Sequence, residues 1–219
     1  MSQVTPQGVE ANKHFGSWSG YAPGMTDAAQ GRIGSASSIR VWTSNRRMPP
    51  LILTVQFDSV SQKLFDEHRR RYFPPERNVV PAHLTLFHQL EDTESTFSIL
   101  TEMARGQCAF SVAVAGLRSL GRGVAFALES EALERMRAQL AGAFASQVIA
   151  QDRQPFRPHV VIQNKTTAEN ARATLSEIGQ HFVPFSAEVL GFEVWVYRDG
   201  PWEFRKSIPF AQEDATAQD

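Results

Sequence analysis

The chain has 219 residues, 42% of them hydrophobic and 10% aromatic, which is enough for one packed domain or two small lobes. Its formal net charge of -1 excludes a general electrostatic attraction to nucleic acid or to membranes, so any basic surface must be local. The single cysteine excludes an intrachain disulfide, no apolar run approaches a membrane span, and the N-terminus lacks a secretory signal, so we expect a cytoplasmic protein without membrane contact.

Composition divides the chain into three parts. Residues 1–48 are rich in Gly, Ser, Ala and Thr and show no helical or strand period, so we expect a disordered N-terminal arm. Residues 49–210 carry regular apolar patterns and form the folded domain. Residues 211–219 are polar and acidic and are expected to be a disordered tail.

Strand-like and helix-like patterns alternate through the folded domain. In chain order they predict a strand at 51–57, a helix at 60–73, a strand at 82–87, a helix at 93–105, strands at 109–117 and 123–130, a helix at 131–147, a strand at 158–163, a helix at 167–182, and strands at 186–198 and 202–210. This alternation indicates an α+β fold.

Two of the predicted strands are similar to each other. "PAHLTLFHQL" at 81–90 and "RPHVVIQNK" at 157–165 are both proline-led apolar runs with a histidine near the start, and a helix precedes and follows each. This approximate duplication predicts two pseudo-symmetric lobes, with β-sheets that line a central cleft and helices on the outside. Each wall of the cleft would then contribute one histidine, His83 or His159.

Strand alternation assigns the side chains near each histidine to a face. His83 and Thr85 share one face of the first strand, and His159, Val161, Gln163 and Lys165 share one face of the second. The opposite faces are aliphatic and are expected to meet the helices. A lone histidine of this kind is usually a hydrogen-bonded packing residue, but two at equivalent positions favour a pair that takes and delivers protons.

The remaining titratable residues give weaker signals. His88 falls on the face opposite to His83, which favours a structural role, and His68 lies in an apolar helical row that favours packing. The histidines and the cysteine have no metal-ligand spacing, so we expect neither a metal ion nor another cofactor.

These two segments resemble the signature strands of the two-histidine (2H) phosphoesterase superfamily, in particular its bacterial 2'-5' RNA ligase-like branch. The resemblance covers about residues 49–210 and includes "LRSLGRGVAFAL" and "DGPWEF". It implies a metal-independent phosphodiesterase or RNA ligase with His83 and His159 as the acid/base pair and Thr85 holding a phosphate oxygen. The implied partner is a nucleotide or an RNA 3'-end with a cyclic phosphate, and we expect a monomer.

The second motif departs from the family, because Val161 occupies the position of the second hydroxyl residue. Val161 either marks weakened catalysis or contacts an apolar part of the substrate while Gln163, Lys165 or a backbone N–H holds the phosphate. Lys165 and Arg122 are further candidates for offsetting phosphate charge, although both also fit a solvated surface. The alternative functions are a nucleotide or RNA-end binding module with weakened catalysis, and a non-nucleotide hydrolase or structural protein.

Overall fold

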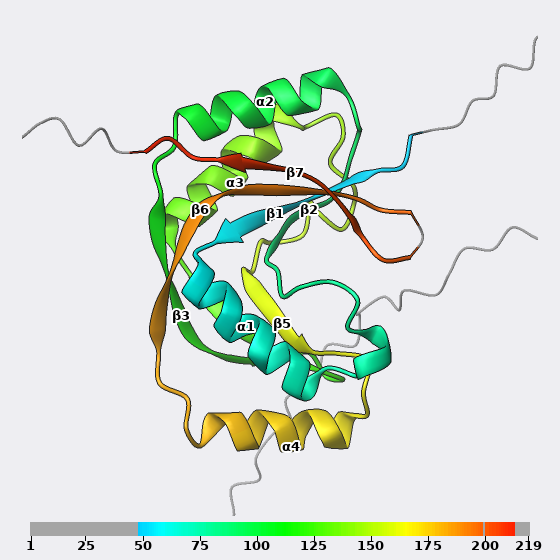
Figure 1. Cartoon of the computed structure of the whole chain (residues 1–219), viewed down its shortest axis with the longest axis vertical. Coiled ribbons are helices and arrows are strands. Elements are labelled where there is room, and N and C mark those ends of the chain that lie inside the picture. Colours follow the sequence, from blue (N-terminus) through cyan, green and yellow to red (C-terminus); the bar gives the residue numbers. More distant parts are fainter. Residues whose placement is uncertain (1–47, 199, 213–219) are drawn as a thin grey trace, which may run out of the picture. The chain divides into compact units, whose positions relative to one another are not determined.

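The computed structural model describes residues 48–198 and 200–212, so the predicted arm before Met48 and the tail after Gln212 lie outside the described residues. Its elements are β1 (Leu51–Phe57), α1 (Ser59–Tyr72), the 3-10 turn η1 (Pro75–Arg77), β2 (Thr85–Leu90), α2 (Glu94–Arg105), β3 (Phe110–Ser119), β4 (Val124–Glu129), α3 (Glu131–Ala143), β5 (His159–Gln163), α4 (Ala168–Gly179), β6 (Phe185–Val196) and β7 (Glu203–Pro209) (Figure 1). No helix within these ranges combines the length and apolar character needed to cross a membrane.

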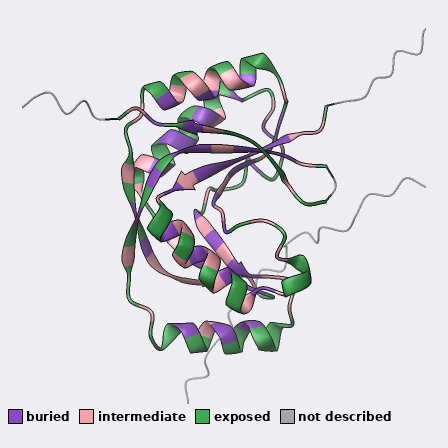
Figure 2. Cartoon of the chain, in the orientation of Figure 1, coloured by how far each residue is buried: buried purple, intermediate pink, exposed green. Residues whose placement is uncertain are grey.

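Local sequence explains where the four helices begin. Asp58, Thr93, Ser130 and Thr167 are the N-cap residues, and each accepts a hydrogen bond from a backbone N–H of the first turn. Such caps satisfy amide groups that have no partner inside the helix. In Figure 2 each helix shows both buried and exposed residues, as expected for amphipathic helices that cover a sheet.

All seven strands belong to one antiparallel sheet, in the order β2-β1-β6-β3-β4-β5, with β7 also paired to β6. The long strand β6 joins the two halves. Its first part pairs with β3, with Val112 opposite Ala187, and its second part pairs with β1, with Leu53 opposite Val194. The predicted α+β class with two related lobes is confirmed, but the lobes share a continuous sheet.

The helices cross between the halves of the duplication. We call β1, β2, β7 and the second part of β6 the first lobe, and β3, β4, β5 and the first part of β6 the second lobe. α1 packs against β5, and its Phe65 ring lies 5.7 Å from that of Phe126 on β4. Conversely, Phe144 at the end of α3 lies 5.7 Å from Phe87 on β2. Helix α1, which precedes β2, therefore covers β5. Helix α3, which precedes β5, covers β2.

Several predicted boundaries differ from the structure, two of them in ways that matter for the site and for the extent of the domain. The first histidine strand is predicted to start at residue 82, but β2 begins at Thr85, so His83 lies just before the strand. The folded domain extends at least one residue past 210, because Ala211 forms a bridge with Cys108 and donates its N–H to backbone carbonyls at 104 and 107.

Candidate active site

A β-bulge follows the first histidine. In the pairing of β1 with β2, Thr54 lies opposite Thr85, and the next residue back, Leu53, lies opposite Phe87. Leu86 is therefore an extra residue. Because two residues of the bulged strand oppose one on its neighbour, the alternation of side chains reverses at this point. Thr85 and Phe87 then lie on opposite faces of the sheet.

The second histidine is followed by a bulge at the equivalent position. Ala125 of β4 lies opposite Val161 of β5, and the next residue back, Val124, lies opposite Gln163. Ile162 is the extra residue. The bulges thus fall three positions after His83 and three positions after His159, so the duplication extends to an irregularity of the backbone.

The bulges define which side chains share a surface with the histidines. We use the term histidine face for the side of the sheet that carries Thr54, Thr85, Ala125 and Val161, together with His83 and His159. The predicted position of Gln163 on this face is not found. Gln163 lies beyond the bulge, is buried, and donates its side-chain amide to Thr174 Oγ1 of α4, 2.8 Å away.

Both histidine rings make the same hydrogen bond. Nδ1 of His83 lies 2.8 Å from the carbonyl oxygen of Pro81, and Nδ1 of His159 lies 2.8 Å from that of Arg157. A carbonyl can only accept, so Nδ1 carries the proton in both rings. Nε2 is then the atom that takes or releases a proton, and the two copies are prepared in the same tautomer.

Helix α1 fixes the backbone just before His83. Gln62 donates its side-chain amide to the carbonyl of Ala82 at 2.9 Å, and Asp66 accepts the N–H of Ala82 at 2.7 Å. Gln62 and Asp66 are one helical turn apart and therefore lie on the same side of α1. Both backbone groups of Ala82 are occupied, which restricts the position of the histidine that follows.

Both histidines are half-buried, and burial lowers the pKa of each. Burial lowers the pKa of His83 to about 4, with smaller contributions from the charges of Arg69, His88 and His159, while the bond to Pro81 opposes the shift. Burial also lowers the pKa of His159, and the charges of Arg118 and His88 act in the same direction. Both are neutral near pH 7.

Two charged residues on the histidine face were not identified in the sequence. Arg118 lies opposite Ala125, which lies opposite Val161, and Glu193 lies opposite Thr54. Arg118 is half-buried and makes no side-chain hydrogen bond or ion pair with any other described residue. Burial raises the pKa of Glu193, and the charge of Asp66 adds to the shift. The predicted strand at 109–117 stops one residue before Arg118, so strand alternation did not assign that residue to a face.

Contrary to the prediction from strand alternation, His88 does not lie on the face opposite to His83. The bulge at Leu86 reverses the alternation before His88, and the charge of His88 lowers the pKa of both His83 and His159. Its Nδ1 lies 2.6 Å from Oδ1 of the buried Asp152, whose carboxylate also accepts the backbone N–H of His88.

The two predicted cations lie at the other end of β5. This strand runs from His159 to Gln163, and Lys165 follows in a loop with a φ of 57°. Arg122, in the turn between β3 and β4, donates its Nε to the carbonyl of Thr166 at 2.9 Å. The structure therefore groups Arg122 with the Lys165 loop and does not bring either residue together with the histidines.

An aromatic group borders His83. The ring of Trp202, between β6 and β7, lies 4.5 Å from the His83 ring, and Trp195 lies 6.3 Å from Trp202 and 5.3 Å from Phe204. Trp195 is held in place because its indole N–H donates to Thr54 Oγ1 at 3.0 Å. Phe204 is 53% exposed, so part of this aromatic surface is open to solvent.

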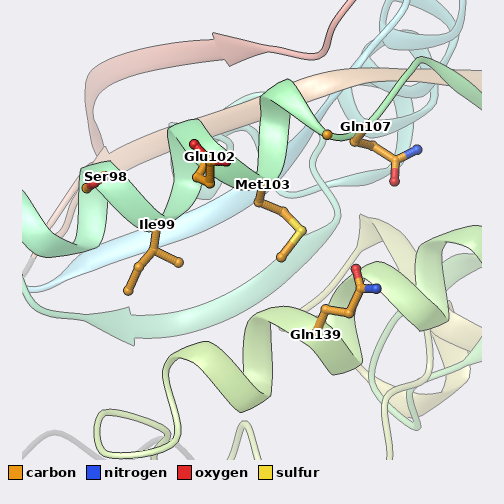
Figure 3. Close-up of a pocket in the computed structure, with 7 residues that line it drawn as sticks. Ser98, Ile99, Glu102, Met103, Gln107 and Gln139 are labelled. Carbon is orange, nitrogen blue, oxygen red and sulfur yellow. The ribbon is translucent and has the colours of Figure 1, made fainter.

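One hollow of the described chain lies away from the histidines. An open groove of about 590 Å³ runs between α2 and α3 (Figure 3). Its lining residues are Ser98, Ile99, Glu102, Met103, Gly106, Gln107 and Gln139. None belongs to the histidine face. Within residues 48–198 and 200–212, no three His, Cys, Asp or Glu side chains come together as a possible metal-binding set.

The pKa shifts predict how the histidines titrate. In an NMR titration of the free protein, His83 should protonate near pH 4 and His159 below the usual histidine value of about 6.5. Because the folded-state values are lowered, the unfolded chain binds more protons as pH falls from about 6.5 toward 4, so the free energy of unfolding should decrease over that window. Single His→Gln variants assign the two signals. Ordinary titration of both rings near pH 6.5 would contradict the burial described above.

The sequence and the fold of this chain are similar to those of known proteins. Residues 57–201, which include both histidines, match the family model of the 2'-5' RNA ligase superfamily. Among solved structures, TT0787 of Thermus thermophilus superposes with a TM-score of 0.54 at 17% identity, over 75% of this chain and 99% of that one. A protein described as a phosphoesterase gives a TM-score of 0.50 at 17% identity with the same coverage, and E. coli LigT with 3'-AMP gives 0.49 at 20%. No curated protein sequence matches the chain.

Proposed function

We propose that this chain, which belongs to the 2'-5' RNA ligase superfamily, is a metal-independent phosphodiesterase or RNA ligase that uses His83 and His159 as its acid/base pair. Its substrates are nucleotides or RNA ends with a 2',3'-cyclic phosphate or a 2'-5' linkage. The observation that carries the proposal is the pair of equivalent histidines, each with Nδ1 bound to the carbonyl two residues earlier. We further propose that it acts as a cytoplasmic monomer without a cofactor.

The reaction proceeds by in-line displacement at phosphorus. In hydrolysis of a cyclic phosphate, Nε2 of one histidine removes a proton from water as the water oxygen bonds to phosphorus. The bond from phosphorus to one ribose oxygen breaks, and that oxygen receives the proton from Nε2 of the other histidine. The pair ends with its protons exchanged and returns to its starting state through solvent. In ligation a ribose hydroxyl replaces water: one histidine takes the hydroxyl proton as its oxygen bonds to phosphorus, and the other protonates the ribose oxygen that leaves the cyclic phosphate.

Substrate binding supplies the protonated histidine. With both pKa values lowered in the free protein, neither ring holds a proton near pH 7. A phosphodiester anion next to a ring favours the charged imidazolium and raises its pKa. The imidazolium that acts as the general acid therefore forms at the histidine next to the bound phosphate.

Arg118 is proposed to replace the missing hydroxyl of the second motif. Thr85 can hold a phosphate oxygen on the first strand, whereas Val161 cannot. Arg118 faces Val161 across the small side chain of Ala125, at two strand spacings, or about 10 Å between backbones. A long guanidinium side chain crosses much of that distance, and this one has no partner in the described chain. A cation held there stabilises the phosphoryl oxygens as charge develops.

The aromatic group next to His83 supports a nucleotide or an RNA end as the substrate. Trp202 and the partly exposed Phe204 offer rings on which a base can stack while the phosphate lies at the histidines. Stacking on aromatic side chains tolerates any base, because every base has a π-face. The aromatic group thus contributes affinity and little sequence preference.

The test is turnover of 2',3'-cyclic AMP by the purified protein in excess EDTA, followed by separation of the nucleoside monophosphates. We expect conversion to a single monophosphate isomer, unchanged by the chelator. Loss of activity in EDTA that a divalent ion restores would refute the metal-independent mechanism. A screen with 2'-5' linked dinucleotides and RNA with 2',3'-cyclic phosphate ends distinguishes hydrolysis from ligation.

The second candidate is a nucleotide or RNA-end binding module with weakened catalysis, and Val161 favours it because one phosphate-binding hydroxyl is absent. Calorimetric binding of 3'-AMP without turnover of any cyclic phosphate would support this module. Absence of both binding and turnover would exclude both candidates.

A further inference from the structure

Two buried arginines connect each half of the duplication to the histidine strand of the other. We infer that Arg69 of α1 and Arg137 of α3 are positioning residues, which hold β5 and β2 at a fixed separation and thereby set the distance between His159 and His83. The expected effect of these arginines on the rate of turnover rests on the proposed function. Their expected effect on the positions of the two histidine rings does not.

Arg69 joins the helix before His83 to the strand that carries His159. Its Nη1 donates to the carbonyl oxygen of Val161 at 2.8 Å. Its Nε donates to Asn78 Oδ1 at 2.8 Å and to the carbonyl of Val80 at 3.2 Å. The guanidinium lies 4.0 Å above the Phe73 ring, and the residue is only 4% exposed. One planar group thus fixes the segment leading to His83 relative to β5.

Arg137 makes the reciprocal connection. It lies on the helix before His159, and its Nε donates to the carbonyl of Leu86 in β2 at 2.7 Å. Its Nη2 donates to the carbonyl of Asp152 at 2.8 Å. The guanidinium lies 3.7 Å above the Phe87 ring, and the residue is 6% exposed.

Both arginines bind at the bulges. Leu86 is itself the extra residue of β2, and Val161 directly precedes the extra residue of β5. β2 and β5 are also the two end strands of the sheet order, so each has one edge without a strand partner. The arginines provide hydrogen-bond donors at those edges. The bulges lie there as well, and they bend the strand and thereby determine the orientation of the histidine side chain.

Stability alone does not account for arginine at these positions. Neither guanidinium forms an ion pair with a carboxylate of the described chain, and both lie in regions poor in water. Burial lowers the pKa of Arg69 to about 10 and also lowers that of Arg137. Burying a charge opposite neutral carbonyls costs free energy that an apolar side chain of similar volume would avoid. Unlike such an apolar side chain, arginine supplies several N–H donors that are held in one plane.

The two arginines differ in their electrostatic effect on the histidines, which allows the effect of their charge to be measured apart from the effect of their hydrogen bonds. The charge of Arg69 lowers the pKa of His83, whereas Arg137 affects neither histidine in this way. Arg69→Met should therefore raise the NMR titration midpoint of His83, and Arg69→Lys, which keeps a charge, should change it less. Arg137→Met should leave the midpoint unchanged. Equal midpoints for Arg69→Met and wild type would exclude a charge effect, so that any loss of turnover in the Arg69 variants would report bracing alone.

Turnover tests the brace itself. At a temperature well below every melting point, Arg69→Lys and Arg137→Lys should each lower kcat on 2',3'-cyclic AMP about tenfold with little change in KM, because small misplacements of catalytic groups reduce the rate steeply. Met136→Ala, a buried change on the same helix as Arg137, is the matched control for lost stability. Full activity in the arginine variants would refute the positioning role. The same conclusion would follow if Met136→Ala lowered kcat as much as they do while all the proteins are equally folded.

A measurement without catalysis keeps the inference testable if the proposed function fails. In wild-type protein, titrated inorganic phosphate should perturb the NMR signals of His83 and His159 with a single binding constant. In Arg137→Lys, the two signals should respond with weaker and unequal constants, because the rings no longer flank one anion. Unchanged constants in this variant would overturn the inference, whatever the turnover assay gives.

Discussion

Replacing either His83 or His159 with glutamine is expected to lower kcat/KM on a 2',3'-cyclic nucleotide by about 10²-fold or more, the usual scale for a positioned acid or base. In the proposed mechanism each ring supplies one of two proton transfers at phosphorus, and glutamine keeps much of the shape without titrating. The double variant should be little worse than the poorer single one, because the two residues act as a unit. Stopped assays over pH 4 to 9 give the rates.

His181→Gln is a suitable control, because this histidine is exposed at the end of α4 and outside the site. In wild-type protein the kcat/KM profile should keep activity below pH 6, since burial lowers both histidine pKa values and a neutral base persists there. If His83→Gln and His159→Gln are as active as His181→Gln, the acid/base assignment is wrong.

Arg118→Gln is expected to lower kcat/KM about 10- to 100-fold. Hydrogen bonds to charged groups contribute about 1.5–3 kcal/mol, and roughly 1.4 kcal/mol corresponds to a factor of ten. Val161→Thr should change the wild-type rate little if Arg118 already holds the phosphate, but should recover part of the loss in the Arg118→Gln background. Thr85→Val should lower the rate in either background. The four-variant cycle measures this coupling directly.

Arg122→Gln is the matched control for that cycle. Arg122 lies in the adjoining turn and donates to Thr166, away from the histidines, so its loss should leave kcat/KM nearly unchanged. Equal losses for Arg118→Gln and Arg122→Gln would show a general charge effect. A several-fold gain from Val161→Thr in the wild type would instead show that the second phosphate contact is missing.

Periodicity predicted every helix and strand of the described domain, because each element has an apolar face that local spacing reveals. The same reasoning misplaced Gln163 and His88. Strand alternation holds only while every residue is paired, and one extra residue at Ile162 or Leu86 reverses it without any change in polarity. The sequence contains no local mark of these bulges.

The duplication predicted two related halves, each with one histidine at an equivalent position, but not how the halves are joined. Equivalent motifs at 83 and 159 indicate related lobes, and the Nδ1 bonds and shared electrostatics agree with that relation. The exchange of α1 and α3 between lobes depends on contacts distant in sequence, such as that of Phe65 with Phe126, which propensities do not encode. Arg69 and Arg137 have local patterns typical of solvated helix faces, so their roles appear only in three dimensions.

The sharing of β6 between the lobes has a consequence for how the protein is made. β1 pairs with the second part of β6, so a strand near residue 53 must wait for one near residue 194. At ribosomal rates of about 5–20 residues per second, the interval is on the order of ten seconds. During that time β1 has β2 as its neighbour and one open edge, and loop closure over such a span makes the final pairing slow. A gene built from two similar halves therefore yields a single cooperative unit, whose first half cannot finish folding before the ribosome has completed the second.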